Sequence, residues 1–440
     1  MSFFWIIFQL MLAGLFFIMN RRRRVSELTV IFFVIVSLIA IAFPTANLLT
    51  TVYSWRNVEV FDGPVLVVTQ QNYFLLLLGV FVASILIPSW SVIHKEASPK
   101  PRRYSLSIGR DTFMVCGLIG TGIMLYAQFI LAVGFLTLFN TDNFAEKYDT
   151  GGNTGPLYFG FSLVLVGALW AEAGRVSRLL LWMARSVLGM LLIWSVLLIY
   201  IRWPVIMVLI GYGTIWARGR DFKISNLRIL PILLTILVVF VFEGYSVYRG
   251  VVASGGGIKS FVSQFSLTEL IGLMIGGSEL IHSFVTAGEV IAEYQTKAPN
   301  FASFLKNLEV LIPKALSSSR GYSEAQYFAL RNYEVLFDRG GGTGYSLVAS
   351  GVSYFPPYIG MFLFGLVFGA ILSQADRVSR AYPNGLLAIY TPSLGYYVLT
   401  AERAGLIAFL KTQMLLFIFV LILYLIFVLL SKSPSKMRSS

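Results

Sequence analysis

The stretch that decides the fold is SVLLIYIRWPVIMVLIGYG, at residues 195–213. It interrupts an apolar run with a guanidinium group at Arg202 and a helix breaker at Pro204. One helix over residues 179–216 would be far longer than the ~30 Å hydrocarbon core of a bilayer, whereas two helices would each cross it once. Proline is favoured in the first turn of a helix, where its missing N–H needs no partner. We therefore predict a tight turn at residues 200–204, with Arg202 at the outer interface.

The composition extends this interpretation to the whole chain. Of its 440 residues, 57% are hydrophobic and only 12% are charged, whereas about 25% of the residues in soluble domains are charged. Apolar runs recur from end to end, which predicts an all-α integral membrane protein. The first run has no basic segment before it and no small-residue cleavage site after it, so we expect a retained span. We expect eleven transmembrane helices, near residues 2–20, 27–50, 71–93, 112–139, 156–174, 179–201, 204–218, 226–246, 353–374, 384–400 and 407–431.

The distribution of charge orients these spans. The formal net charge is +13, and the basic residues cluster in short loops, beginning with Arg21–Arg24 directly after the first run. Because positive residues stay on the cytoplasmic side of a membrane, we expect a periplasmic N-terminus and a cytoplasmic C-terminus. The same clustering explains the charge without nucleic acid as a partner. We predict an N-terminal transmembrane bundle of about eight spans at residues 1–246, a large periplasmic loop at residues 247–352, and a C-terminal bundle of about three spans at residues 353–440.

The long outer loop is too large to be a simple connector. The stretches FSLTELIGLMIGGSELIHSFVTAGEVIAEYQ, at residues 265–295, and YSEAQYFALRNYEVLF, at residues 322–337, place apolar residues at helical spacing. This periodicity is typical of amphipathic helices. We therefore expect a helical cap over the outer face of the membrane.

Three arginines stand at the predicted outer boundary: Arg202, Arg320 and Arg403. A guanidinium group never loses its charge and can bond two phosphate oxygens at once, which favours an anionic ligand. The alternative is that each arginine only extends toward lipid headgroups. For a general base we rank highest Glu279 and His282, which are three residues apart and share a helix face.

Other acids could serve as the base, and the alternative for all of them is a solvated helix face. They are Glu289, Glu293, Asp338 and Glu402.

The sequence excludes several kinds of site. Cys116 is the one cysteine, so neither an intrachain disulfide nor a cysteine metal cluster can form. The two histidines, His94 and His282, fall on opposite sides of the predicted membrane, which excludes a histidine zinc site. The glycine-rich stretch at residues 340–346 lacks the lysine of a phosphate loop. We expect no cofactor and no metal, with an oxygen-ligated ion as the open alternative.

Three stretches give the sequence its resemblance to a known family. They are LIPKALSSSRGYSEAQ at residues 311–326, RGGGTGYSLVASGVSYFPPYIGMFLFGLVFG at residues 339–369, and LTAERAGLIAFLKTQ at residues 399–413. With the arginine between two spans and the large outer loop, they resemble the O-antigen polymerases (Wzy type), which join oligosaccharide repeat units. The likeness in hydropathy covers nearly the whole chain, and the likeness in motifs covers roughly residues 195–215 and 305–415.

The resemblance implies a glycosyltransferase with a C-type-like fold in the bacterial inner membrane. Its substrates would be undecaprenyl-diphosphate-linked oligosaccharides, and its partners would be membrane lipid, a chain-length regulator and a flippase. It assigns diphosphate binding to Arg202, Arg320 and Arg403. Tyr322 and Tyr327 could stack on sugar rings, or belong to an interfacial aromatic belt.

Three other functions remain open. An O-antigen ligase would hand the glycan to lipid A core, but such ligases usually carry a loop histidine in an H-x-H-N-like context, which His282 in LIHSFV lacks. Transporters and flippases tend to place charges in mid-membrane and to show two-fold repeats, and neither is evident. The third is a non-enzymatic subunit of a polysaccharide export complex.

Overall fold

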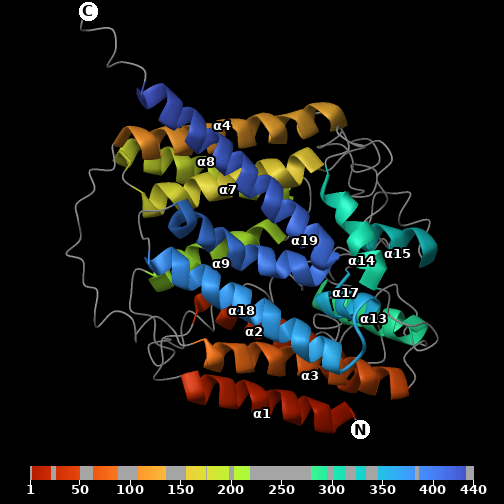
Figure 1. The fold of residues 1–440 in the computed structure, drawn as a ribbon. Helices are drawn as coiled ribbons and strands as arrows, with labels where there is room; N and C mark the ends of the chain where they lie inside the picture. Colours follow the sequence, from red (N-terminus) through yellow and green to blue (C-terminus); the bar gives the residue numbers. More distant parts are fainter. Residues whose placement is uncertain are drawn as a thin grey trace, which may run out of the picture.

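The computed structural model describes residues 2–20, 26–49, 63–87, 108–134, 155–174, 176–197, 203–218, 279–294, 301–312, 324–332, 345–381 and 386–432. Within these ranges the regular structure is helical (Figure 1). The elements are α1 (Ser2–Asn20), α2 (Glu27–Leu49), α3 (Gly63–Leu86), α4 (Ile108–Val133), α7 (Gly155–Ala173), α8 (Arg178–Leu197), α9 (Trp203–Arg218), α13 (Glu279–Tyr294), α14 (Phe301–Asn307), the 3₁₀-helix η4 (Leu308–Leu311), α15 (Glu324–Asn332), α17 (Leu347–Tyr354), α18 (Ile359–Ala381) and α19 (Leu386–Lys432).

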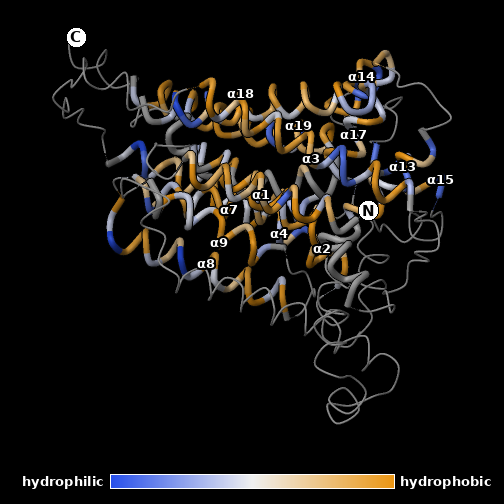
Figure 2. Tube along the Cα trace, turned by 90° about the horizontal axis from the view of Figure 1, so that it is seen from below, coloured by the Kyte–Doolittle hydropathy of each residue, from blue (hydrophilic) through white to orange (hydrophobic). Residues whose placement is uncertain are grey.

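The described helices confirm an all-α membrane protein. Six of them contain segments long and apolar enough to cross a bilayer, and three shorter helical segments are also apolar. In Figure 2 hydrophobic residues dominate the middles of the long helices. The predicted span at residues 226–246 lies outside the described residues, so the count of eleven spans and the three-part division of the chain stay predictions. The six long segments are Pro64–Leu86, Gly109–Val133, Gly155–Ala173, Arg178–Val196, Ile359–Ser379 and Gly405–Ser431.

Residues 195–213 belong to two helices. α8 ends at Leu197 and α9 begins at Trp203, which places Pro204 in the first turn of α9 as predicted. Arg202 itself lies outside the described residues. The short connection means that the end of α8 and the start of α9 lie at the same end of the bundle.

Two helices begin six or more residues from the predicted start. α3 starts at Gly63 rather than near residue 71, because its polar residues bond to their own helix: Thr69 Oγ1 donates to Val65 O at 2.7 Å. α18 starts at Ile359 rather than at residue 353. Pro356 and Pro357 follow the end of α17, and a proline disfavours helical geometry in the residue before it.

α19 is two helices joined by a reversal at Gly405, whose φ of 82° and ψ of 173° are not helical. The hydroxyl of Tyr390, in the first half, donates to Gln413 Oε1 of the second half at 2.6 Å. The ring of Tyr390 also meets that of Phe417 with 5.6 Å between the ring centroids. The two halves therefore run antiparallel and correspond to the last two predicted spans.

Glycine allows the closest approach between helices in the bundle. A Cβ atom on Gly365 of α18 would lie 2.2 Å from Leu76 O of α3, and one on Gly79 of α3 would lie 2.2 Å from Phe362 O of α18. Small residues let backbones meet in membranes, where burial of apolar surface does not drive helices together. Backbone contact at these two glycines therefore fixes the packing of α3 against α18.

The described helices of the large loop gather at one end of the bundle. α13, α14, α15 and α17 lie at the end where α1 begins, and the two halves of α19 meet there (Figure 1). α13 packs against the bundle through the ring of Phe284, which stacks on Tyr73 of α3 with 5.3 Å between the centroids. We call these four helices and η4 the end layer.

We predict that Gly365→Ala lowers the free energy of unfolding by about 1–3 kcal/mol, because the added methyl group overlaps the backbone of α3. The measurement is thermal unfolding of the purified protein in detergent. Gly189→Ala in α8 is the matched control, since its Cβ would meet nothing within 4 Å. Equal unfolding temperatures for the two variants would contradict the close packing of α3 and α18.

Candidate functional site

The sequence-predicted site residues fall into three groups in the structure. Tyr327 of α15 is 60% exposed. Glu279 and His282 lie on α13, and Arg403 lies on α19. For these three residues the structure describes the backbone and not the side chain. Lying outside the described residues are Arg202, Arg320 and Tyr322. The roles assigned to all seven stay predictions.

Among the lower-ranked acids, Glu293 has a structural role. Its carboxylate forms an ion pair with Arg331 of α15, which ties α13 to α15. This arrangement favours the solvated helix face that the sequence analysis gave as the alternative to a base. Glu289 is partly buried on α13, Asp338 lies outside the described residues, and the side chain of Glu402 is not described.

A buried carboxyl group that was not among the predicted site residues lies in the end layer. Glu324 is the first residue of α15 and is 6% exposed. Its Oε2 atom accepts hydrogen bonds from Ser350 Oγ at 3.1 Å and from the Ile407 amide at 3.4 Å. Ser350 Oγ in turn accepts from the Leu406 amide at 3.0 Å. One carboxyl group thus connects α15, α17 and the reversal in α19; we call this set the Glu324 junction.

The reversal in α19 explains why the Leu406 and Ile407 amides need hydrogen-bond acceptors from other elements. The first amides of a helix have no partner within it, and Leu406 and Ile407 begin the second half of α19. Capping usually comes from the side chain of the residue before the helix, but Gly405 has none. A Cβ atom on Gly405 would lie 2.7 Å from Glu324 Oε2 and 2.9 Å from Ser350 Oγ. Both its left-handed φ and this lack of space therefore require glycine.

α14 joins the junction through Tyr354, the last residue of α17. Asn307 Nδ2 donates to the Tyr354 hydroxyl at 2.8 Å, and that hydroxyl interacts with the Glu324 carboxyl group. Oε1 of Glu324 is buried and accepts no hydrogen bond of good geometry from any residue that the structure describes.

Burial raises the pKa of Glu324 to about 7 from its ordinary value of 4.5, because desolvation disfavours the charged form. Interactions with Tyr354, the Ile407 amide and Ser350 act in the opposite direction, since they stabilise the carboxylate. The pKa of Tyr354 is raised by burial and by the charge of Glu324, so its hydroxyl keeps its proton. The junction therefore holds a carboxyl group that changes charge near neutral pH, which is typical of functional sites and also of buried structural networks.

One signal in the sequence could have identified part of this junction. Ser346, Ser350 and Ser353 recur at helical spacing and so share one face of α17, and every residue of this helix is buried. Ser346 caps the helix by accepting from the Ala349 amide, and Ser353 bonds to the Tyr345 hydroxyl. Nothing comparable marks Glu324, whose partners lie far away along the chain.

Comparisons with known protein families, with curated proteins and with solved structures give no match. In the part of the chain that the structure describes, no group of three or more histidine, cysteine, aspartate or glutamate side chains is placed to hold a metal ion. The Glu324 junction is therefore the candidate site that the described geometry provides.

We predict that the contribution of Glu324 to the stability of the protein falls as the pH rises from 4.5 to 7. In this range the folded protein holds the Glu324 proton more tightly than the unfolded chain does, so deprotonation costs up to about 3 kcal/mol of unfolding free energy. Glu324→Gln removes the titrating group and this component with it. The measurement is thermal unfolding in detergent between pH 4.5 and 8, and the advantage of wild type over the variant should shrink as the pH rises.

Glu309→Gln is the control for this experiment, because Glu309 is an exposed acid in the same end layer. Measured over the same pH range, it shows what the loss of an exposed carboxyl group alone does to the unfolding temperature. A constant difference between wild type and Glu324→Gln would contradict the raised pKa.

Proposed function

We propose that this protein is a membrane glycosyltransferase that joins undecaprenyl-diphosphate-linked oligosaccharide repeat units into O-antigen or a related surface polysaccharide. In this proposal it acts in the bacterial inner membrane, and the end layer lies on the periplasmic side. The growing glycan moves from its lipid carrier to the non-reducing end of a newly flipped repeat unit. A chain-length regulator and a flippase are its expected partners.

The observation that carries the proposal is the convergence of the three stretches on which the family resemblance rests. Glu324 belongs to the first stretch, Ser350 to the second, and Leu406 and Ile407 to the third. They are joined by hydrogen bonds in one buried junction. Motifs that meet in space although they are distant in sequence are expected of parts of one site.

Two of the proposed diphosphate-binding arginines belong to the same stretches of sequence as residues of this junction. Arg320 precedes Glu324 by four residues, and Arg403 precedes Gly405 by two. An extended chain spans at most ~3.6 Å per residue, so the backbone of Arg403 lies within about 7 Å of Gly405. Arg202, the third arginine, directly precedes α9.

The chemistry of the donor fits this arrangement. No ATP is available outside the cytoplasmic membrane, so the donor must carry its own activation. A sugar on a lipid diphosphate does so, because the diphosphate departs as a stable anion. Preorganised guanidinium groups would stabilise the charge that develops on it, and a single well-placed donor is worth ~3–4 kcal/mol. In the proposal Glu279 or His282 takes the proton of the acceptor hydroxyl, while Tyr322 and the exposed Tyr327 stack on sugar rings.

We predict that Arg202→Ala and Arg403→Ala each reduce polymerisation at least ~100-fold, since each removes charge stabilisation of the leaving group. The assay uses purified protein with a lipid-diphosphate repeat unit and follows the ladder of glycan lengths. Lys306→Ala is the matched control, because this exposed basic residue of α14 lies in the end layer and has no role in the proposal. Full activity in both test variants would contradict the diphosphate-binding role, and transfer to lipid A core without a ladder would indicate a ligase.

We further predict that the reaction continues after divalent metal ions are removed by chelation, because the arginines supply the positive charge that a metal would provide. The same ladder assay, run with and without a chelator, measures this. Activity that is lost on chelation and restored by Mg²⁺ would require an oxygen-ligated metal in the mechanism.

A further inference from the structure

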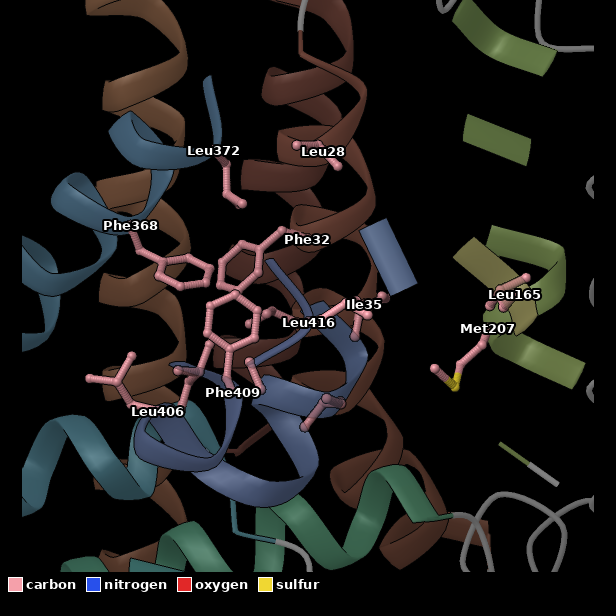
Figure 3. Close-up of a cluster of buried hydrophobic side chains, with 14 of the residues drawn as sticks. Leu28, Phe32, Ile35, Leu165, Met207, Phe368, Leu372, Leu406, Phe409 and Leu416 are labelled. Atoms are coloured by element: carbon pink, nitrogen blue, oxygen red, sulfur yellow. The ribbon is translucent and has the colours of Figure 1, made fainter. Parts of the chain in front are cut away.

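The reversal at Gly405 is held on two sides. On the bundle side, Figure 3 shows Leu406 and Phe409 of α19 beside Phe368 of α18, with Phe32 of α2 against the same cluster. The ring centroids of Phe368 and Phe409 are 5.8 Å apart, and those of Phe32 and Phe368 are 4.9 Å apart. On the end-layer side, the amides of the reversal bond to Ser350 and Glu324.

Of these two kinds of contact, the hydrogen bonds to Ser350 and Glu324 are the directional ones. Apolar packing fixes how deep Leu406 lies, but it is non-directional. Hydrogen bonds weaken steeply when they bend, so those to the Leu406 and Ile407 amides fix how the backbone is rotated. A negative carboxylate at a helix N-terminus is also favoured by the helix dipole.

Arg403 is close in sequence to the backbone that these hydrogen bonds hold. It lies two residues before Gly405, in the last turn of the first half of α19. A change in the backbone rotation at the reversal would therefore move the point from which the arginine side chain leaves the helix. Glu324 bonds to the Ile407 amide directly and reaches the Leu406 amide through Ser350.

We propose that Glu324 is a positioning residue for the lipid-linked substrate: by holding the backbone at Gly405–Ile407, it sets the place from which Arg403 binds the diphosphate headgroup. This inference rests on the proposed function for the identity of the ligand. Glu324 acts through the backbone and is not a catalytic residue, because its buried carboxyl group bonds to protein atoms of α17 and α19. Either a carboxylate or a side-chain amide could fill this role, since both offer an acceptor oxygen.

The first arm of the test measures the reversal without any substrate. Hydrogen exchange of the full-length protein in lipid nanodiscs is followed for the amides of Leu406 and Ile407. Glu324→Ala should speed exchange of these amides at least tenfold, whereas Glu324→Gln should keep them protected. Glu309→Gln is the control and should match wild type. Unchanged protection in Glu324→Ala would overturn the proposal.

The second arm asks whether Glu324 acts through Arg403. Binding of undecaprenyl diphosphate is measured for wild type, Glu324→Ala, Arg403→Ala and the double variant. We expect each single variant to weaken binding about tenfold or more, and the double variant to bind no more weakly than Arg403→Ala alone. Fully additive losses would overturn the proposal, because independent sites add whereas coupled ones do not. Weak binding by Glu324→Gln with protected amides would also overturn it, since a charge effect would then operate without a change in the backbone.

Failure of the proposed function has a different signature. A wild-type protein that binds undecaprenyl diphosphate but forms no glycan ladder would contradict the polymerase activity and leave the positioning role supported. A wild-type protein that does not bind this lipid would overturn the substrate-positioning role, even if the exchange arm showed that Glu324 holds the reversal.

Discussion

The structure depends on how the backbone amides of the α19 reversal are satisfied. In a membrane protein an unpaired buried N–H costs several kcal/mol, so a chain can reverse among packed helices only where acceptors are provided. Gly405 makes the turn sterically possible but offers no side chain to cap the helix that follows. Glu324 and Ser350 supply the missing acceptors from two other elements. A local requirement of one helix thus ties together the end layer and the transmembrane bundle.

The bundle is suited to carry this junction because its helices meet at backbone distance. Gly79 and Gly365 bring α3 and α18 into contact, and Gly122 and Gly160 do the same for α4 and α7, where each Cβ would lie within 2.7 Å of the partner's carbonyl oxygen. Such contacts leave little room for one helix to shift against another. Polar residues in the spans add directional contacts between helices. The Tyr126 hydroxyl of α4, for example, forms a hydrogen bond with Ser195 Oγ of α8 at 3.0 Å. The reversal is therefore attached to a framework that resists displacement.

Local features of the sequence predicted much of the fold. Pro204 correctly separated α8 from α9, and the gap left between residues 400 and 407 contains Gly405, where α19 reverses. The start of α3 was missed because Thr69 and Asn72 bond to the backbone of their own helix, which the sequence alone does not show. Glu324 was missed for a related reason: its role depends on partners 26 and 83 residues away along the chain, and no local pattern records such contacts.

The order of the chain gives the Glu324 junction a consequence for biogenesis. Glu324 and Ser350 precede Gly405 in sequence, so the ribosome makes the acceptors before the donors that they bind. Before the last helical hairpin docks, a water-exposed carboxyl group at this position would have its ordinary pKa of 4.5 and would be ionised at neutral pH. Once docked, its pKa is about 7. By linkage, closing the bundle takes up a fraction of a proton from the surrounding solution, so completion of the membrane domain should be easier on the more acidic side of neutrality.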